Sequence, residues 1–93
     1  MIQSFQHRGL RRFYEAGSTT AIQTRHAQRL RMQLAALNTA YVIEDMDIPG
    51  FRLHRLKGAG RGRWSILIEG DFRLTFGFLN GHAYALDYEE HPG

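Results

Sequence analysis

The fold is decided by residues 64–88, which read WSILIEGDFRLTFGFLNGHAYALDY. Apolar and polar residues largely alternate in this stretch, with the period of two that is typical of half-buried β-strands. Two turn signals divide it, Gly70-Asp71 and Asn80-Gly81, and the second is a pair that type I′ hairpins prefer. The strands that this pattern predicts are residues 64–69, 72–78 and 82–88.

The register of these strands follows if both turns contain two residues. Arg73 would then lie opposite Ile68 on one side and Tyr88 on the other, as the one charge in an aromatic and aliphatic face. An unpaired charge there is costly, so it requires a partner, either Glu90 or a ligand phosphate. The other face is rich in phenylalanine and is predicted to pack against helices. A shift of the strand register by one residue at either turn would move these side chains to the opposite face of the sheet.

The residues before this sheet predict two helices. The first is expected at residues 7–15, where apolar residues follow helical spacing, and Gly17 suits the left-handed conformation that ends a helix. The second is expected at residues 23–37, where leucines recur on one helical face. Thr20 and Gln23 match a capping box at its start.

A further strand is expected at residues 51–57, after turn residues at 47–50. Helices followed by a meander of strands indicate an α+β fold, with two N-terminal helices packed on a small twisted antiparallel sheet. The length of 93 residues fits one domain spanning residues 1–93.

Composition excludes several classes of site. The chain has no cysteine, which removes disulfide frameworks, thiolate zinc sites and cysteine nucleophiles. The five histidines show no paired ligand spacing, so we expect neither a metal nor another cofactor. No apolar run approaches the roughly 20 residues of a membrane span, and the first residues do not resemble a signal peptide. We therefore expect a soluble cytoplasmic protein.

The charged residues suggest a nucleic-acid partner. Net charge is +3, and eleven of the twelve basic residues are arginine, Lys57 being the only lysine. Arginine presents a planar fork of donors that matches phosphate and stacks on bases. Basic residues gather at 8–31 and 52–73, and acidic residues at 44–47 and 87–90. This segregation suggests a surface for an anionic partner, although ordinary solvated charge accounts for it equally well.

A small set of residues in the back half has the chemistry for RNA cleavage. Attack by the RNA's own 2′-hydroxyl needs a base, an acid for the leaving oxygen and positive charge on the transition state, without a metal. In a regular strand His54 and Lys57 face opposite ways, so they converge only if the strand ends or bulges near Leu56. The candidate catalytic residues are His54, Lys57, Arg73, Glu90 and His91.

The loop at residues 57–63 is a second candidate for binding phosphate. Its glycines allow backbone N–H groups to approach an anion, and its arginines add charge. It lacks the Gly-Lys-Ser/Thr ending of a P-loop, and a solvated hairpin loop is the alternative. The candidate RNA-binding residues are Arg61 and Arg63 in this loop and Arg55 just before it.

Several segments, in this order, carry a resemblance to a known family. They are residues 1–10 (MIQSFQHRGL), 15–17 (EAG), 43–46 (IEDM), 53–58 (LHRLKG), 64–65 (WS), 72–76 (FRLTF), 80–84 (NGHAY) and 87–89 (DYE). Over nearly its full length the chain resembles the HigB-like toxins of the RelE/ParE superfamily, which belong to bacterial type II toxin–antitoxin systems.

The resemblance implies a RelE-like fold and a metal-independent endoribonuclease that inhibits translation by cutting mRNA in the ribosomal A site. It also implies a helix-turn-helix antitoxin of the HigA type as partner. The family's functional residues fall on His54, Lys57 and Arg73, and its C-terminal acid falls on Glu90. The family tail ends Tyr-Glu-Asp-Tyr-His, whereas residues 88–91 read YEEH, so the penultimate tyrosine is missing and His91 stands one position early. This departure bears on the efficiency of cleavage rather than on the fold.

Two alternatives use the same fold without RNA cleavage. One is a toxin that poisons its target by binding, as ParE-type relatives do with gyrase. The other is an RNA-binding module whose basic face only contacts nucleic acid.

Overall fold

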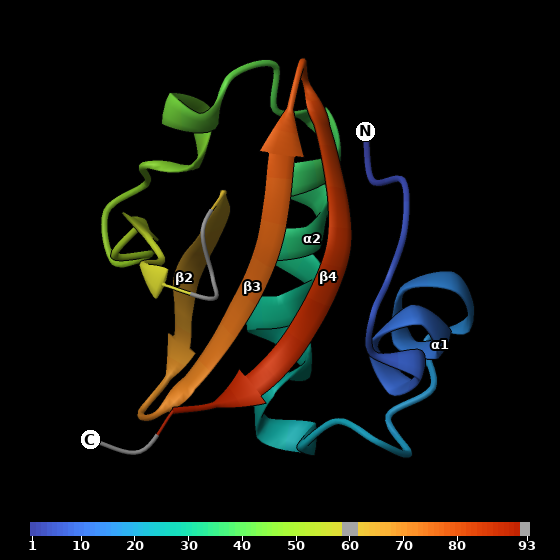
Figure 1. The fold of residues 1–93 in the computed structure, drawn as a ribbon. Helices are drawn as coiled ribbons and strands as arrows, with labels where there is room; N and C mark the ends of the chain where they lie inside the picture. The colour runs from blue at the N-terminus through green and yellow to red at the C-terminus, as the bar shows by residue number, and fades with distance from the viewer. Residues whose placement is uncertain (59–61, 92–93) are drawn as a thin grey trace.

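The chain forms a four-stranded antiparallel sheet with one helix across its face and another beside its edge (Figure 1). The structure is a computed structural model, and it describes residues 1–58 and 62–91. Its strands follow the order β1-β2-β3-β4. Along the chain the elements are α1 (Arg8–Ala16), the 3-10 turn η1 (Thr24–His26), α2 (Ala27–Thr39), the 3-10 turn η2 (Ile43–Met46), β1 (His54–Arg55), β2 (Arg63–Glu69), β3 (Phe72–Leu79) and β4 (His82–Glu90).

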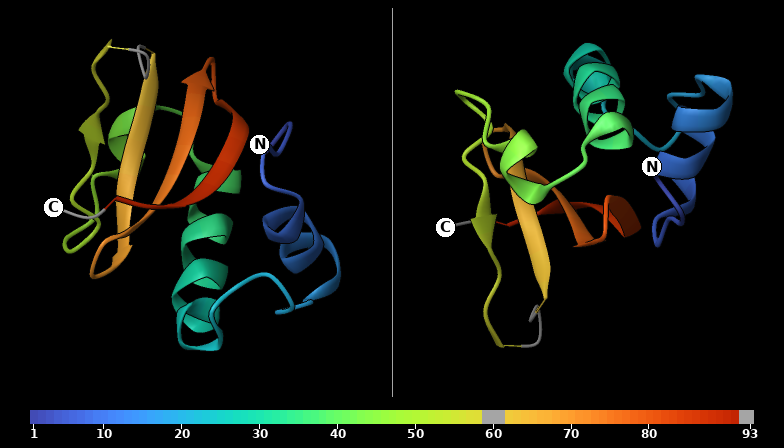
Figure 2. Two further views of the ribbon diagram at one scale, coloured as in Figure 1. Left: turned by 60° about the horizontal axis from the view of Figure 1, so that its bottom comes forward. Right: turned by 90° about the horizontal axis from the view of Figure 1, so that it is seen from above.

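The core lies between α2 and the sheet, as the two views in Figure 2 show. The α+β fold with two N-terminal helices is confirmed, and so is the packing of helix against the phenylalanine-rich face. Phe76 is fully buried there, and Phe72 and Phe78 pack against the same cluster. Fully buried leucines and isoleucines complete it: Leu10, Leu30, Leu37, Ile66, Leu74 and Leu86. Among the described residues, no helix is long and apolar enough to cross a membrane.

The first helix matches its prediction more closely than the second. Gly17 ends α1 in the left-handed conformation (φ 75°), with its N–H bonded to the carbonyl of Phe13. The capping box predicted at Thr20 and Gln23 is wrong, because α2 begins only at Ala27, after the η1 turn, and Gln23 makes no side-chain cap. The backbone N–H of Gln23 instead donates to the hydroxyl of Tyr88. A tertiary contact therefore replaces the local one.

The strand predicted at residues 51–57 shrinks to two residues, His54 and Arg55. Phe51 is buried in the core, and Arg52 has a positive φ of 50°, which an extended strand does not allow. Strand pairing with β2 therefore starts at His54, after a single backbone hydrogen bond from the N–H of Leu67 to the carbonyl of Phe51. It extends past β1 by one hydrogen bond, from the N–H of Leu56 to the carbonyl of Arg63.

The predicted register is wrong in half of the sheet because two bulges intervene. The Asn80-Gly81 hairpin and the pairing of Gly77 with Tyr84 are as predicted. One extra residue in β4, at the positive-φ Ala85 (φ 51°), then shifts the partners, and Arg73 lies opposite Glu89 instead of Tyr88. A second bulge in β2 places Arg73 opposite Leu67 instead of Ile68. Arg73 still lies, as predicted, on the face that the helices leave uncovered, but its neighbours there are Leu67 and Glu89.

Candidate active site

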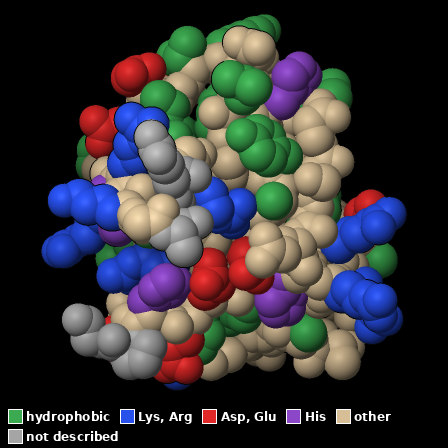
Figure 3. Space-filling model, viewed as in Figure 1, with side chains coloured by type: hydrophobic (Ala, Val, Ile, Leu, Met, Phe, Trp, Pro, Cys, Tyr) green, Lys and Arg blue, Asp and Glu red, His purple; other side chains and the backbone are tan. Residues whose placement is uncertain are grey.

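The sheet face opposite α2, here called the open face, carries its side chains in three rows across the strands. Because successive residues of a strand point to opposite faces, the pairings define these rows. The rows are Arg63–Gly77–Tyr84, His54–Ser65–Thr75–Asp87 and Leu67–Arg73–Glu89. Figure 3 shows this face with acidic side chains near its middle and basic and histidine side chains beside them.

A pocket of about 470 Å³ lies on the open face. Lys57 reaches it because β1 ends at Arg55, which frees the chain from strand geometry before Lys57. His91 reaches it because the bulged β4 curves toward the β2 side of the sheet at its C-terminal end (Figure 1). The lining residues of this open-face pocket are Gln6, Leu56, Lys57, Arg63, Asp87, Glu89 and His91.

A hydrogen-bonded chain of side chains forms the wall of this pocket. Arg63 donates through Nη2 to the hydroxyl of Thr75 at 3.2 Å and to the carbonyl of Ala85 at 2.8 Å. The Thr75 hydroxyl donates to Oε2 of Glu89. The other carboxylate oxygen of Glu89, Oε1, lies 3.3 Å from Nε2 of His91. Side chains from β2, β3 and β4 are thereby linked to His91.

His54 lies on the same face but outside the lining of the pocket. It pairs with Ser65, and its side chain is exposed. Nδ1 of His54 lies 3.2 Å from the carbonyl oxygen of Arg52. Donation from Nδ1 to that carbonyl would leave Nε2 with the lone pair, available to a substrate on the open face.

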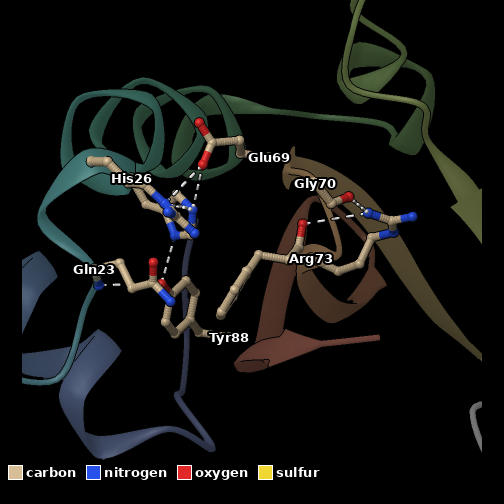
Figure 4. Close-up of polar contacts among 8 residues, drawn as sticks. Gln23, His26, Glu69, Gly70, Arg73 and Tyr88 are labelled. Carbon is tan, nitrogen blue, oxygen red and sulfur yellow. Dashed lines mark hydrogen bonds and ion pairs between the residues drawn. The ribbon is translucent and has the colours of Figure 1, made fainter. Parts of the chain in front are cut away.

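The remaining predicted residues do not gather at the pocket. Arg73 donates through Nη1 to the carbonyls of Gly70 and Phe72, so its guanidinium lies over the β2–β3 hairpin (Figure 4). Glu90 pairs with Phe72 and therefore faces the opposite way from Glu89. The predicted partnership of Arg73 with Glu90 is thus wrong: among the described residues they form no ion pair, and the bulge is the reason.

Arg55 and Arg61 are the two other arginines that the sequence predicts to bind RNA. Arg55 faces away from the pocket, with its guanidinium 5.7 Å from the centre of the Trp64 ring. Arg61 lies outside the described residues.

Sequence reasoning missed the acidic residues of the open-face pocket, Asp87 and Glu89, and the buried hydroxyl of Thr75. Finding them requires the β4 bulge, because the unbulged register assigns the alternate residues of the strand to this face. The residue at the bulge is an alanine, and alanine carries no signal for a positive φ.

Behind the sheet, a second polar cluster fixes the end of β4 (Figure 4). His26 is buried, with Nδ1 at 2.6 Å from the hydroxyl of Tyr88 and Nε2 at 3.0 Å from a carboxylate oxygen of Glu69. Burial raises the pKa of the Tyr88 hydroxyl, reinforced by Glu69 and Glu90 and opposed by the N–H of Gln23 and by Arg25. The cluster ties the strand that carries Glu89 to the start of α2.

The donor set offers little to a metal ion. Within residues 1–58 and 62–91, no three histidine or acidic side chains are placed to hold one. The chemistry available at the open-face pocket is therefore that of a lysine, an arginine, a histidine and two carboxylates.

Comparison with known proteins identifies the family. A family model described as a RelE-like toxin of the type II toxin–antitoxin system HigB matches residues 3–91. The chain belongs to the HigB-like toxin family. Endoribonuclease HigB of Proteus vulgaris is 40% identical over 91 residues, which are 98% of this chain and 99% of that protein. The HigB-like match therefore includes both helices, the whole sheet and every residue of the open-face pocket.

Proposed function

We propose that this HigB-like toxin is an endoribonuclease that cuts mRNA on the ribosome and so inhibits translation. The observation that carries the proposal is the open-face pocket, which joins Lys57, Arg63 and His91 in a chain similar to Endoribonuclease HigB. The toxin would act in the cytoplasm, where ribosomes translate mRNA.

The proposed reaction uses the 2′-hydroxyl of the RNA. A base removes the hydroxyl proton, O2′ bonds to phosphorus, the P–O5′ bond breaks, and an acid protonates O5′. The products are a 2′,3′-cyclic phosphate and a 5′-hydroxyl end. His54 and His91 supply the two proton transfers, since histidine titrates near neutral pH. Lys57 stabilises the charge on the transferring phosphate, and Arg73 and Arg63 bind the RNA strand.

The shape of the site supports a single-stranded substrate held by another particle. The pocket lies on an exposed sheet face, and the side chains of His54 and Lys57 are both exposed. Such a shallow face offers few groups that could straighten a free RNA strand. A ribosome presents mRNA already extended, which would supply the positioning that the toxin lacks.

Purified toxin tests the proposal against its alternatives. One mRNA is incubated with toxin alone and with toxin plus programmed ribosomes, and the new ends are mapped and analysed chemically. We expect cutting only with ribosomes and a 2′,3′-cyclic phosphate at the new 3′ end. Equal cutting of free mRNA would reject ribosome dependence. Growth arrest by a toxin that leaves mRNA intact would instead favour action by binding.

The family implies an antitoxin partner, and we propose that it is a HigA-like helix-turn-helix protein that covers basic surface with acidic side chains. The arginines of the first helices are not equivalent in this respect. Arg11 pairs with Glu15, and Arg25 pairs with Glu69. Arg8 and Arg12 are exposed and form no ion pair within the described residues, which makes them the preferred contacts.

A further inference from the structure

We propose that Glu89 is a positioning residue that holds the imidazole of His91 at the open-face pocket, and that Thr75 and Arg63 hold Glu89 in turn. The inference rests on the proposed function, because it gives Glu89 a role only through proton transfer by His91. It assigns a part in the reaction to a carboxylate that is not among the functional residues implied by the family resemblance.

The first step is the contact between Glu89 and His91. Oε1 of Glu89 lies 3.3 Å from Nε2 of His91, and both side chains are partly exposed at the pocket wall. The two atoms lie at ion-pair distance, and a negative carboxylate attracts an N–H and repels a lone pair, so the hydrogen of the neutral ring is favoured on Nε2 and its lone pair on Nδ1. The contact therefore selects the nitrogen that exchanges a proton with RNA.

The second step is the anchoring of Glu89 itself. Its other oxygen accepts a hydrogen bond from Thr75, whose side chain is fully buried. Thr75 accepts from Arg63, and Arg63 also donates to the carbonyl of the bulge residue Ala85. Arg63 on β2 donates to Thr75 on β3, and Thr75 donates to Glu89 on β4, so the chain of hydrogen bonds crosses three strands and ends at Glu89. Connected, satisfied networks of this type rigidify their members.

Without the Glu89 contact, the His91 side chain would be free to change its rotamer. His91 follows the last residue of β4, and its backbone is held by one hydrogen bond, from its N–H to the carbonyl of Asp71 at 2.7 Å. That bond leaves the side-chain rotamer open. The Glu89 contact restricts it, as carboxylates do for catalytic histidines in general. Both oxygens of Glu89 are occupied, so the residue is placed to orient His91 rather than to act on RNA.

Asp87 provides a matched control. It lines the same pocket from the same strand, two residues before Glu89. Its Oδ1 accepts the local N–H of Tyr88, at 2.9 Å, and among the described residues it forms no hydrogen bond or ion pair with His91. Replacing Asp87 removes one negative charge from the pocket without freeing the imidazole.

A double-mutant cycle on ribosome-dependent cleavage tests the inference. We expect Glu89→Gln to lower kcat about 10- to 100-fold with little change in KM, and Asp87→Asn to change kcat by the same factor in the wild-type and His91→Ala backgrounds. In a His91→Ala background Glu89→Gln should cost nothing further. Thr75→Val should resemble Glu89→Gln, whereas Thr75→Ser, which keeps the hydroxyl, should restore most of the rate. Equal melting temperatures exclude simple unfolding.

Three results would overturn the inference. Full activity of Glu89→Gln would show that the contact has no part in the reaction. An equal loss from Glu89→Gln with and without His91 would show that Glu89 acts by itself. Full activity of His91→Ala would show that His91 takes no part in the reaction and would reject the positioning role of Glu89. The proposed endoribonuclease function would be unaffected by that result. If the wild-type toxin cuts no RNA, side-chain scalar couplings of His91 measured by NMR still decide: one rotamer should dominate in wild type and several should be populated in Glu89→Gln.

Discussion

At the scale of single residues, the choice of lysine at position 57 is informative. A chain with eleven arginines uses its only lysine at the edge of the pocket. The lysine ammonium is a compact charge on a flexible stem, whereas the arginine fork requires a fixed planar partner. A phosphate whose charge moves between oxygens during the reaction suits the first type of group. Arginine serves instead at position 63, where fixed hydrogen bonds are needed.

The bulge residue Ala85 leads to a prediction about stability. Its φ of 51° strains an alanine by about 1–2 kcal/mol, and glycine adopts that conformation freely. Ala85→Gly should therefore raise the free energy of unfolding by up to about 1 kcal/mol, measured by denaturant titration. Ala83→Gly, at a buried position outside the positive-φ residues, is the control and should lower it. A loss of stability in Ala85→Gly would contradict the bulge.

At the scale of elements, the sequence predicted the helix end and the hairpin turn that depend on local interactions. Gly17 ends α1 and Asn80-Gly81 turns the last hairpin, because each is set by the conformational range of one or two residues. The start of α2 and the length of β1 were not predictable in this way. The first depends on Tyr88 binding the backbone of Gln23, and the second on burial of Phe51.

The link between β4 and α2 predicts a pH dependence. The pKa of Tyr88 is raised in the fold, chiefly by burial, so the folded state disfavours the ionised hydroxyl. Unfolded tyrosine ionises near pH 10, hence stability from this group is complete below about pH 10 and is lost as pH rises further. Thermal unfolding of wild type should therefore show a decline above that pH, and Tyr88→Phe should reduce it.

The same variant should also cost stability at neutral pH. Removing the hydroxyl leaves the buried His26 without its partner on Nδ1, a loss of about 1–2 kcal/mol. Tyr41→Phe, at a side chain that is 85% exposed, is the control. An alkaline decline that is identical in wild type and Tyr88→Phe would show that other groups cause it.

At the scale of the whole molecule, the sequence allowed some residues of the open-face pocket to be predicted, and others were missed. Lys57, Arg63 and His91 were each named from the sequence, and they line one pocket. Glu90 was named from the family tail and from the unbulged register, whereas the bulge in β4 makes Glu89 the one of the two that lines the pocket. A sequence shows the type of each residue. The sheet face to which a side chain points depends on its position in the alternation along the strand, and one bulge residue shifts that alternation.

The antitoxin surface gives a prediction at this scale. Arg8→Glu with Arg12→Glu should weaken toxin–antitoxin binding at least tenfold, mainly by slowing association, as calorimetry and stopped-flow measurements can check. Arg11→Glu, which breaks an existing pair with Glu15, is the comparison of equal charge for the single variant Arg12→Glu. Cleavage by the free double variant should be unchanged. Unaltered affinity in the double variant would move the antitoxin to another surface.

The most direct test of the open-face pocket is the single-turnover cleavage rate of ribosome-bound mRNA by two alanine variants. Lys57 lines the pocket, whereas Arg55, two residues earlier, stacks on Trp64 and faces away from it. We expect Lys57→Ala to lower the single-turnover cleavage rate about 10²- to 10³-fold and Arg55→Ala to stay within about threefold of wild type. A Lys57→Ala toxin that cuts at the wild-type rate, or an Arg55→Ala toxin that loses as much, would contradict this expectation.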